Sequence, residues 1–293
     1  MDAPVRHHFT VDVEESFQVS AMERYVARSE WERLPSRVDR GTNQLLELLA
    51  ASGSSGTFFV LGWIAERHPS LVRMIADAGH EVASHGYGHE RVTTITPAQF
   101  RVSVRTSKAI LEAITGAPVI GYRAPSFSII RGGEWALDTL IEEGYRYDSS
   151  LYPVRRTGYG YAGGARDPHD IARAGGVLRE YPPATLGIGS AVLPAGGGAY
   201  FRHLPYQVIE RALIQAEQRR EPATFYIHPW ELDTDEPRIA VPFMTRLRHY
   251  GAVSRTRPRL CRMLARFEFQ SIAASLTVTR NATGHAESIA TAR

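Results

Sequence analysis

The stretch PSLVRMIADAGHEVAS (residues 69–84) contains the unit that decides the fold: an amphipathic helix, a glycine, and a short apolar run. The apolar residues of the first half recur at helical spacing, and glycine is well suited to end a helix in the left-handed conformation. The same unit recurs in residues 42–60, 96–123 and 134–149. Helices that alternate with strands predict a parallel sheet with right-handed crossovers, built either as a barrel or as a doubly wound sheet.

The helix in residues 96–123 has clear boundaries in the sequence. Thr96 can cap its first turn, Gln99 completes a capping box, and Gly116 suits a left-handed stop. Further along the chain, residues 204–218 read as another helix that starts at a proline, and the apolar run at 223–227 follows it. The pattern therefore continues well into the second half of the chain.

The chain has 293 residues, of which 43% are hydrophobic and 22% are charged, as in ordinary globular proteins. No linker or change of composition divides it, so we expect one domain over residues 5–275. Residues 277–293 lack apolar periodicity and predict a frayed tail. Between residues 150 and 200 the pattern gives way to Gly, Pro and Tyr, which predicts long loops of the kind that carry function on α/β scaffolds.

Composition excludes several classes of chemistry and partner. A single cysteine, Cys261, excludes an internal disulfide and a multi-cysteine metal site, and a single lysine, Lys108, argues against Schiff-base chemistry. The net charge is only +3 and the arginines are scattered, so we expect no nucleic-acid partner. No apolar run reaches the ~20 residues of a membrane span, and the N-terminus lacks a secretory pattern, so we expect no membrane insertion and a cytoplasmic location. Nothing in the sequence indicates the oligomeric state.

Polar residues follow the predicted strands at the points where these strands end. They are Asp12, His85, Arg123, Asp148 and His228. In parallel barrels the active site collects at the carboxyl ends of the strands, because the loops that follow the strands converge there. We therefore expect these side chains to share one site.

The sequence HGYGH places His85 and His89 four residues apart, a spacing that suits a divalent metal such as Zn²⁺. A pair of surface histidines is the alternative explanation of this spacing. Asp12 and Glu14 point to the same side of an extended strand, because side chains alternate along it. Two acids in one pocket are costly without a cation, so one carboxylate is expected to bind metal and the other to act as a general base.

The motifs VDVEE, HGYGH, RAPSFS, YDSS and IHPWE follow one another in this order. This series resembles the polysaccharide deacetylases, the NodB-homology domains of carbohydrate esterase family 4, over roughly residues 8–231. The resemblance implies a distorted (β/α)7 TIM-like barrel. Residues 231–275 resemble the C-terminal extension of a subgroup associated with exopolysaccharide loci.

The resemblance implies a catalytic role for five residues. Asp12 matches the catalytic base, and Arg123 matches the arginine that positions it. Ser126 occupies the position whose backbone N–H helps to bind the oxyanion. His228 matches the general acid, and Asp148 matches the carboxylate that tunes it.

The same resemblance implies a metal cofactor. His85 and His89 match the two metal-binding histidines. The family's first motif commonly has two adjacent aspartates, whereas this chain has the spaced form Asp-Val-Glu-Glu. Glu14 is therefore the expected third ligand, with Glu15 in reserve. Zn²⁺ is the expected ion, and Co, Ni, Mn or Fe would also suit two imidazoles and a carboxylate.

The function implied is removal of N-acetyl groups from a polysaccharide or an exopolysaccharide precursor, with release of acetate. Trp230, Tyr152 and Phe127 are predicted to contact the glycan, because aromatic faces and hydroxyl groups suit sugar rings. Two alternatives stay open. The same fold could hydrolyse a small cyclic amide, as allantoinases do, or the chain could be a glycan-binding relative without activity.

Overall fold

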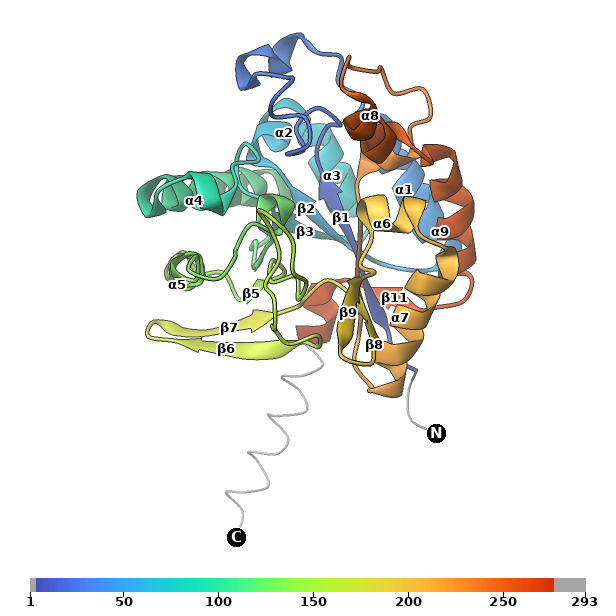
Figure 1. The fold of residues 1–293 in the computed structure, drawn as a ribbon. Helices are drawn as coiled ribbons and strands as arrows, with labels where there is room; N and C mark the ends of the chain where they lie inside the picture. Colours follow the sequence, from blue (N-terminus) through green and yellow to red (C-terminus); the bar gives the residue numbers. More distant parts are fainter. Residues whose placement is uncertain (1–3, 277–293) are drawn as a thin grey trace.

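The computed structural model describes residues 4–276 of the chain (Figure 1). The predicted tail at 277–293 lies outside the described residues. The core is a curled sheet in which the strands run in the order β10-β1-β2-β3-β4-β5-β7-β6, and every pair except β7 with β6 is parallel. This confirms the α/β, TIM-like barrel predicted from the sequence. Within the described residues the path of paired strands ends at β10 and β6, so the barrel is open between them.

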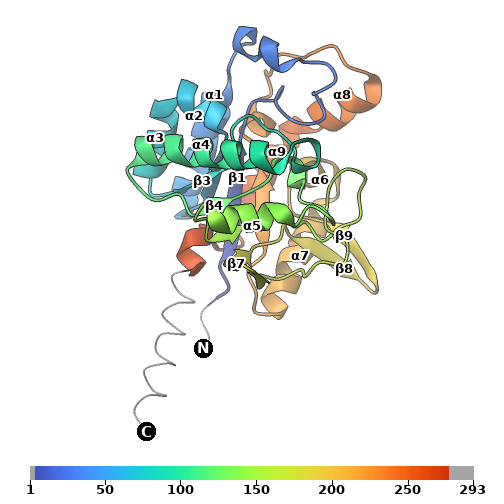
Figure 2. The same cartoon turned by 90° about the vertical axis from the view of Figure 1, so that its left-hand side faces the viewer.

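The elements alternate in the order expected from the repeated unit. The strands are β1 (His7–Val13), β2 (Thr57–Val60), β3 (Glu81–Ser84), β4 (Gly121–Tyr122), β5 (Tyr147–Asp148), β6 (His169–Arg173), β7 (Gly176–Glu180), β8 (Thr185–Ile188), β9 (Ala191–Pro194), β10 (Thr224–Ile227) and β11 (Phe269–Gln270). The helices are α1 (Val38–Ser52), α2 (Gly62–Arg67), α3 (Pro69–Asp77), α4 (Pro97–Thr115), α5 (Trp135–Glu142), α6 (Gly198–His203), α7 (Tyr206–Gln218), α8 (Phe243–Tyr250) and α9 (Thr256–Leu264). The helices surround the sheet, as the view turned by 90° also shows (Figure 2).

The boundaries predicted for the longest helix are confirmed. The hydroxyl oxygen of Thr96 accepts a hydrogen bond from the backbone N–H of Gln99, and the Gln99 side chain accepts one from the Thr96 N–H. At the other end Gly116 has a φ of 68°, which a residue without a Cβ adopts at no steric cost. Local sequence therefore fixes α4 (Pro97–Thr115) at both ends.

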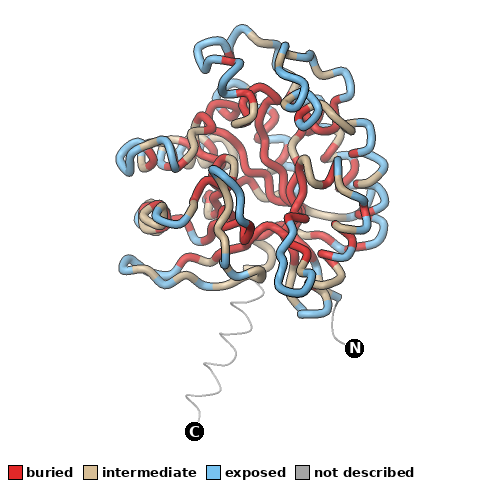
Figure 3. The backbone as a smooth tube through the Cα atoms, in the orientation of Figure 1, coloured by how far each residue is buried: buried red, intermediate tan, exposed pale blue. Residues whose placement is uncertain are grey.

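Side-chain alternation along β1 separates the hydrophobic core from the polar interior of the barrel. Phe9, Val11 and Val13 are buried in the main hydrophobic core together with helix residues such as Leu45. The residues between them point to the opposite face and bring polar groups, including Asp12, into the barrel. The central strands are almost continuously buried, whereas the helices expose their outer faces (Figure 3).

The region predicted as long loops contains two antiparallel hairpins, β6–β7 and β8–β9. Each is closed by a two-residue turn that includes a glycine, Gly175 or Gly189. Exposed and half-buried residues dominate β6, β8–β9 and the first part of β7. These strands therefore lack the apolar signal by which the core strands were recognised. Within residues 4–276, no helix is both long and apolar enough to cross a membrane.

Close packing links α1 to the turn that follows β10. A Cβ at Gly41 would lie 2.1 Å from the backbone oxygen of Pro229, the residue after His228. We predict that Gly41→Ala destabilises the protein by about 1–3 kcal/mol, because the turn must move to relieve the overlap. Denaturant unfolding measures this change. Asn43→Ala, at an exposed position of the same helix, is the matched control and should stay within about 0.5 kcal/mol of the parent protein.

Candidate metal and acid–base site

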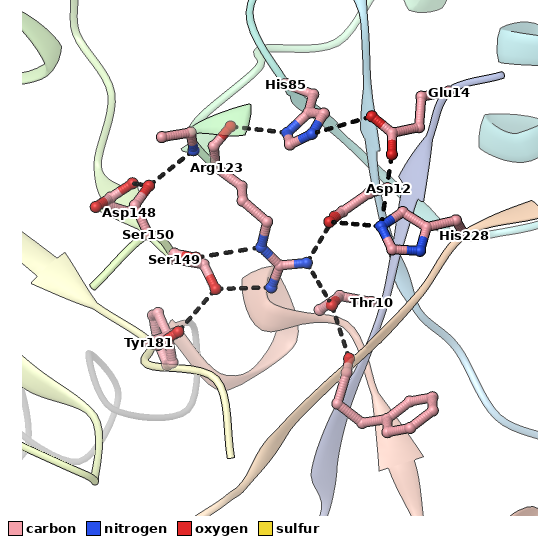
Figure 4. A network of polar contacts seen from close by, with 12 residues as sticks. Thr10, Asp12, Glu14, His85, Arg123, Asp148, Ser149, Ser150, Tyr181 and His228 are labelled. Carbon is pink, nitrogen blue, oxygen red and sulfur yellow. Dashed lines mark hydrogen bonds and ion pairs between the residues drawn. The ribbon is translucent and has the colours of Figure 1, made fainter. Parts of the chain in front are cut away.

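Arg123 fixes the carboxylate of Asp12 at the end of β1. The Nη1 atom of Arg123 donates hydrogen bonds to Asp12 Oδ1 and to the Thr10 hydroxyl, both at 2.7 Å. Its Nε and Nη2 atoms donate to the backbone and side-chain oxygens of Ser149. Arg123 is fully buried and its guanidinium lies 4.2 Å from the ring of Phe59. The guanidinium is therefore held in one orientation, and it holds Asp12 in turn (Figure 4).

Glu14, His85 and His89 form the group predicted to bind a metal. Their candidate ligand atoms all lie within 4.8 Å of one another, and all three residues are buried. Glu14 Oε2 lies 2.8 Å from His89 Nε2 and 3.7 Å from His85 Nε2. The structure thus brings a carboxylate from the end of β1 against two imidazoles that follow β3.

Hydrogen bonding and burial hold His85 and Glu14 in the protonation states that bind a cation. The ring nitrogen Nδ1 of His85 lies 2.8 Å from the backbone oxygen of Arg123, so it donates there and leaves Nε2 as a free electron-pair donor. Burial lowers the pKa of His85 to about 3, which keeps the ring neutral. Burial alone would raise the pKa of Glu14, but the surrounding imidazoles, led by His89, lower it. A neutral imidazole and an ionised carboxylate are the forms that bind metal.

One observation in particular fits a divalent ion. Within residues 4–276, the buried Oε2 atom of Glu14 accepts no hydrogen bond, although two imidazole nitrogens lie near it. A buried carboxylate oxygen without a hydrogen-bond donor is costly, and a cation shared with both imidazoles would remove this cost. His89 has a φ of 59°, a left-handed conformation that is uncommon for residues other than glycine. The donor set therefore fits the metal predicted from the sequence.

His228 faces the two carboxylates from the end of β10. Its Nε2 atom lies 3.5 Å from Glu14 Oε1 and 3.9 Å from Asp12 Oδ2. Its Nδ1 atom lies 2.6 Å from a carboxylate oxygen of Glu231, three residues later in the same turn. Burial alone would lower the pKa of His228, but the Glu231 carboxylate raises it to about 9. The His228 ring is therefore protonated, and its Nε2–H group faces the carboxylates of Glu14 and Asp12.

Glu231 is a functional residue that our sequence analysis did not assign. Its other oxygen accepts a hydrogen bond from Arg202 Nε at 2.5 Å, and both residues are buried. Burial opposes ionisation, but the charges of Arg202 and His228 lower the pKa of Glu231 to about 2. The available signal was the His-Pro-Trp-Glu sequence, because residues three apart meet in a 3₁₀ turn such as Pro229–Leu232.

The segment around α8 supports this acid–base pair. Arg202 donates hydrogen bonds to the backbone oxygens of residues 248, 249 and 251. On the other side of the pair, the Trp230 ring stacks on His228 with a centroid distance of 5.2 Å. His249 stacks on the far face of Trp230 at 4.4 Å. In the described part of the chain, the segment around α8 thus holds Glu231 through Arg202 and packs against Trp230, which stacks on His228.

The resemblance implies that Asp148 tunes His228; this role stays a prediction, and the position of Asp148 does not support a direct contact with His228. Asp148 lies on the opposite side of Arg123 from His228, where its Oδ1 atom accepts a hydrogen bond from Ser150 at 2.5 Å (Figure 4). It is paired there with Glu180. Burial raises the pKa of Asp148 to about 6 and that of Glu180 well above its usual value, so the pair retains a proton. The Ser150 hydroxyl also accepts from the backbone N–H after Arg123, so Asp148 supports the Arg123 loop.

Glu15, the reserve ligand, is occupied elsewhere. Its carboxylate accepts hydrogen bonds from the Ser36 hydroxyl and from the backbone N–H groups of Arg37 and Val38. These groups form the N-terminus of α1, which favours a negative charge. Glu14 is therefore the carboxylate that lies beside the histidines.

Ser126 and Phe127 both have positive φ values, 54° and 51°, in the loop after β4. Such consecutive left-handed residues are costly and are concentrated at functional sites. The Ser126 hydroxyl lies 2.6 Å from that of Ser20. The Phe127 ring is buried against the rings of Tyr152 and Tyr226. The role of the Ser126 backbone N–H as an oxyanion donor stays a prediction.

The structure treats the three predicted substrate contacts differently. Tyr152 is fully buried and its hydroxyl accepts a hydrogen bond from the Gly196 N–H, and its contact with substrate stays a prediction. Phe127 packs beside it, and its contact with substrate stays a prediction. Trp230 borders a cavity of about 280 Å³ that is also lined by Asp233 and Tyr250.

Two family models match the chain, one in each half. Residues 31–132 match the model described as polysaccharide deacetylase. Residues 149–277 match a model described as a domain of unknown function, DUF3473. The first range contains His85, His89 and Arg123, and the second contains His228 and Glu231.

Curated relatives include the peptidoglycan deacetylase of Helicobacter pylori, 34% identical over 113 residues, which are 38% of this chain and 37% of the relative. The chitooligosaccharide deacetylase of Rhizobium leguminosarum bv. trifolii is 32% identical over 135 residues, 46% of this chain and 54% of the relative. The chain thus spans about a third to a half of the length of these relatives.

Two solved structures share the fold. A Mycobacterium smegmatis protein assigned to the polysaccharide deacetylases has a TM-score of 0.65 at 21% identity, with 96% of this chain and 92% of that chain covered. The Puue allantoinase has a TM-score of 0.59 at 18% identity, with 91% and 86% covered. At these identities the likeness shows the fold alone.

We predict that His85→Ala combined with His89→Ala abolishes binding of a stoichiometric divalent metal, because a single carboxylate remains. Elemental analysis of the purified protein measures this loss. His169→Ala combined with His203→Ala removes two imidazoles outside the site and should leave the metal content unchanged. Full metal content in the first double variant would show that the ligands are assigned wrongly.

We predict that Glu231→Gln lowers the pKa of His228 by at least about one unit in the metal-free protein, because the imidazolium loses its anionic partner. Histidine NMR titration measures this pKa. Asp148→Asn is the discriminating comparison, since it mimics a protonated carboxyl and should leave the pKa of His228 unchanged. A larger effect of Asp148→Asn would support the role first assigned to Asp148.

Proposed function

We propose that the chain hydrolyses N-acetyl groups of a glycan and releases acetate, since residues 31–132 match the polysaccharide deacetylase model. The supporting observation is the position of Asp12. Its Oδ1 atom is held by Arg123, and its Oδ2 atom lies 3.9 Å from His228 Nε2, which is also 3.5 Å from Glu14 Oε1. A base, an acid and a candidate metal site thus face the same small volume, as hydrolysis of an amide requires.

Asp12 acts as the general base in this proposal. An N-acetyl amide is a poor electrophile, so the attacking water must lose a proton as it adds to the carbonyl carbon. The Oδ2 atom of Asp12 accepts this proton, because Oδ1 is engaged by Arg123. Arg123 fixes the direction of the carboxylate, and its own contacts with Thr10 and Ser149 keep it in place.

Glu14, His85 and His89 would hold the divalent metal, for which we propose Zn²⁺. Such an ion, when bound, polarises the acetamide carbonyl and acidifies water. Glu14, His85 and His89 are buried away from bulk water, which strengthens these electrostatic effects. The Ser126 backbone N–H is the proposed second donor to the oxyanion.

His228 acts as the general acid. Its Nε2–H faces the site, so it can protonate the amine as the carbon–nitrogen bond breaks. Glu231 binds the opposite nitrogen, which fixes the ring orientation and stabilises the imidazolium. Arg202 holds Glu231 ionised and thereby acts as a positioning residue.

The proposed glycan is an exopolysaccharide or its N-acetylated precursor. This choice is supported by the resemblance of residues 231–275 to the extension found in an exopolysaccharide-associated subgroup. The curated relatives are named for peptidoglycan and for chitooligosaccharides, so oligomers of N-acetylglucosamine are suitable first test substrates.

We predict that the protein releases acetate from N-acetylglucosamine oligomers and that Asp12→Asn lowers the rate by a factor of about 10²–10⁴ while metal content is retained. A carboxamide cannot accept the proton but preserves the shape of the side chain. Coupled acetate detection and elemental analysis measure the two quantities.

Allantoin is the comparison substrate in this experiment. If the protein opens the ring of allantoin and releases no acetate from the glycan, its substrate is a cyclic amide rather than a glycan. Glycan binding without any turnover would indicate a non-catalytic relative.

A further inference from the structure

The proposed base and the proposed metal ligands are almost completely buried, whereas the side chain of His228 is 16% exposed. Asp12 is 3% exposed, Glu14 and His85 are each 1% exposed, and His89 is 5% exposed. In the proposed reaction the attacking water lies within hydrogen-bond distance of Asp12, at about 3 Å, and the acetamido group of the sugar must lie next to this water. Some element must therefore move before a glycan can bind.

Residues 16–26, here called the strap, follow directly after Glu14 and Glu15. At one end the Ser16 hydroxyl donates a hydrogen bond to Glu236. Val19 and Met22 pack with Trp230 in a small hydrophobic cluster. Both Trp230 and Glu236 belong to the segment after β10, so this part of the strap is anchored on the β10 side of the site.

The strap also contacts loops on the other side. The Ser20 hydroxyl lies 2.6 Å from the Ser126 hydroxyl, in the loop after β4. The Glu23 carboxylate accepts hydrogen bonds of 3.1 and 2.7 Å from Arg91, in the loop after β3. The strap therefore joins loops that belong to different strands.

Sheet topology shows what lies beneath the strap. β10 lies on one side of β1, whereas β2, β3 and β4 follow on the other side. A segment that contacts the loops after β10, β3 and β4 must cross the carboxyl ends of the strands between them. Asp12, Glu14 and His85 lie at these ends. Figures 1 and 2 both place the chain after β1 at the same end of the molecule as α8.

We propose that the strap must be displaced for a glycan to reach Asp12, and that its contacts with Ser126 and Arg91 determine how large a glycan the protein accepts. This inference rests on the proposed deacetylase function. Phe17 and Val26 anchor the two ends of the strap in the main hydrophobic core. Between them, the hydroxyl–hydroxyl bond of Ser20 and the partly exposed ion pair of Glu23 are weak contacts, so this middle part can be released most easily. A longer glycan needs more of the strap to move, which makes the strap a determinant of specificity.

A reversible crosslink tests the proposal. Since the two hydroxyl oxygens lie 2.6 Å apart, Ser20→Cys with Ser126→Cys brings two sulfurs within reach of a disulfide. Cys261→Ala removes the only native thiol. After oxidation with glutathione disulfide, kcat/KM for an N-acetylglucosamine tetramer should fall at least about tenfold relative to the same protein reduced with dithiothreitol. An oxidised protein as active as its reduced form would overturn the proposal.

A second variant tests the link to glycan size without a crosslink. Glu23→Gln releases the contact with Arg91 and should raise the ratio of kcat/KM for the tetramer to that for the monosaccharide by about twofold or more. Glu142→Gln breaks a comparable exposed ion pair, with Arg101 on the outer surface, and should leave this ratio unchanged. Equal effects of the two variants would contradict the proposal.

A further readout separates the strap from the proposed activity. Diethyl pyrocarbonate should modify His85 and His89 more slowly in the oxidised, metal-free crosslinked protein than in its reduced form, as measured by peptide mass spectrometry. Absence of acetate release by the parent protein would disprove the deacetylase function and leave this difference in place. Equal modification rates would disprove the strap as a gate, whatever the substrate.

Discussion

Two carboxylates, two residues apart on the same face of β1, are both buried at the mouth of the barrel. Burying a single ionised carboxylate is costly unless a cation or hydrogen-bond donors compensate it. Asp12 is compensated by Arg123, which is buried with all its nitrogens engaged. Glu14 is compensated by three imidazoles and, in our proposal, by a metal. In our proposal Asp12 acts as the base and Glu14 as the metal ligand because different groups stabilise their negative charges.

Most of the site could be predicted because its residues occupy strand ends. Asp12, His85, Arg123 and His228 each end or follow a parallel strand, and barrel topology brings such positions together. The partner of His228 could not be found in this way, because a 3₁₀ turn, rather than a strand, brings Glu231 to it. The burial of Tyr152 was not predictable either, because a sequence does not show which tyrosine hydroxyl is bound to the backbone.

Neither of the two regions matched by family models contains a whole site. Residues 31–132 provide two imidazoles and Arg123, whereas residues 149–277 provide His228 and its supporting residues. Asp12 and Glu14 lie before both regions, Asp12 on β1 and Glu14 directly after it. The hydrogen bonds from Arg202 to the chain around α8 show that the second region has a direct structural role in orienting the acid. The domain of unknown function is thus part of the catalytic unit in our proposal.

The position of β1 has a consequence for the order in which the chain can fold. β1 is synthesised before the other strands, yet it pairs with β10, more than 200 residues later in the chain, and its first residues pair with β11. A ribosome must therefore synthesise more than 200 further residues before β1 is paired on both sides. Pairings this distant in sequence are slow to form. During synthesis the nascent chain exposes a hydrophobic strand edge, so we expect it to depend on chaperones that shield such edges.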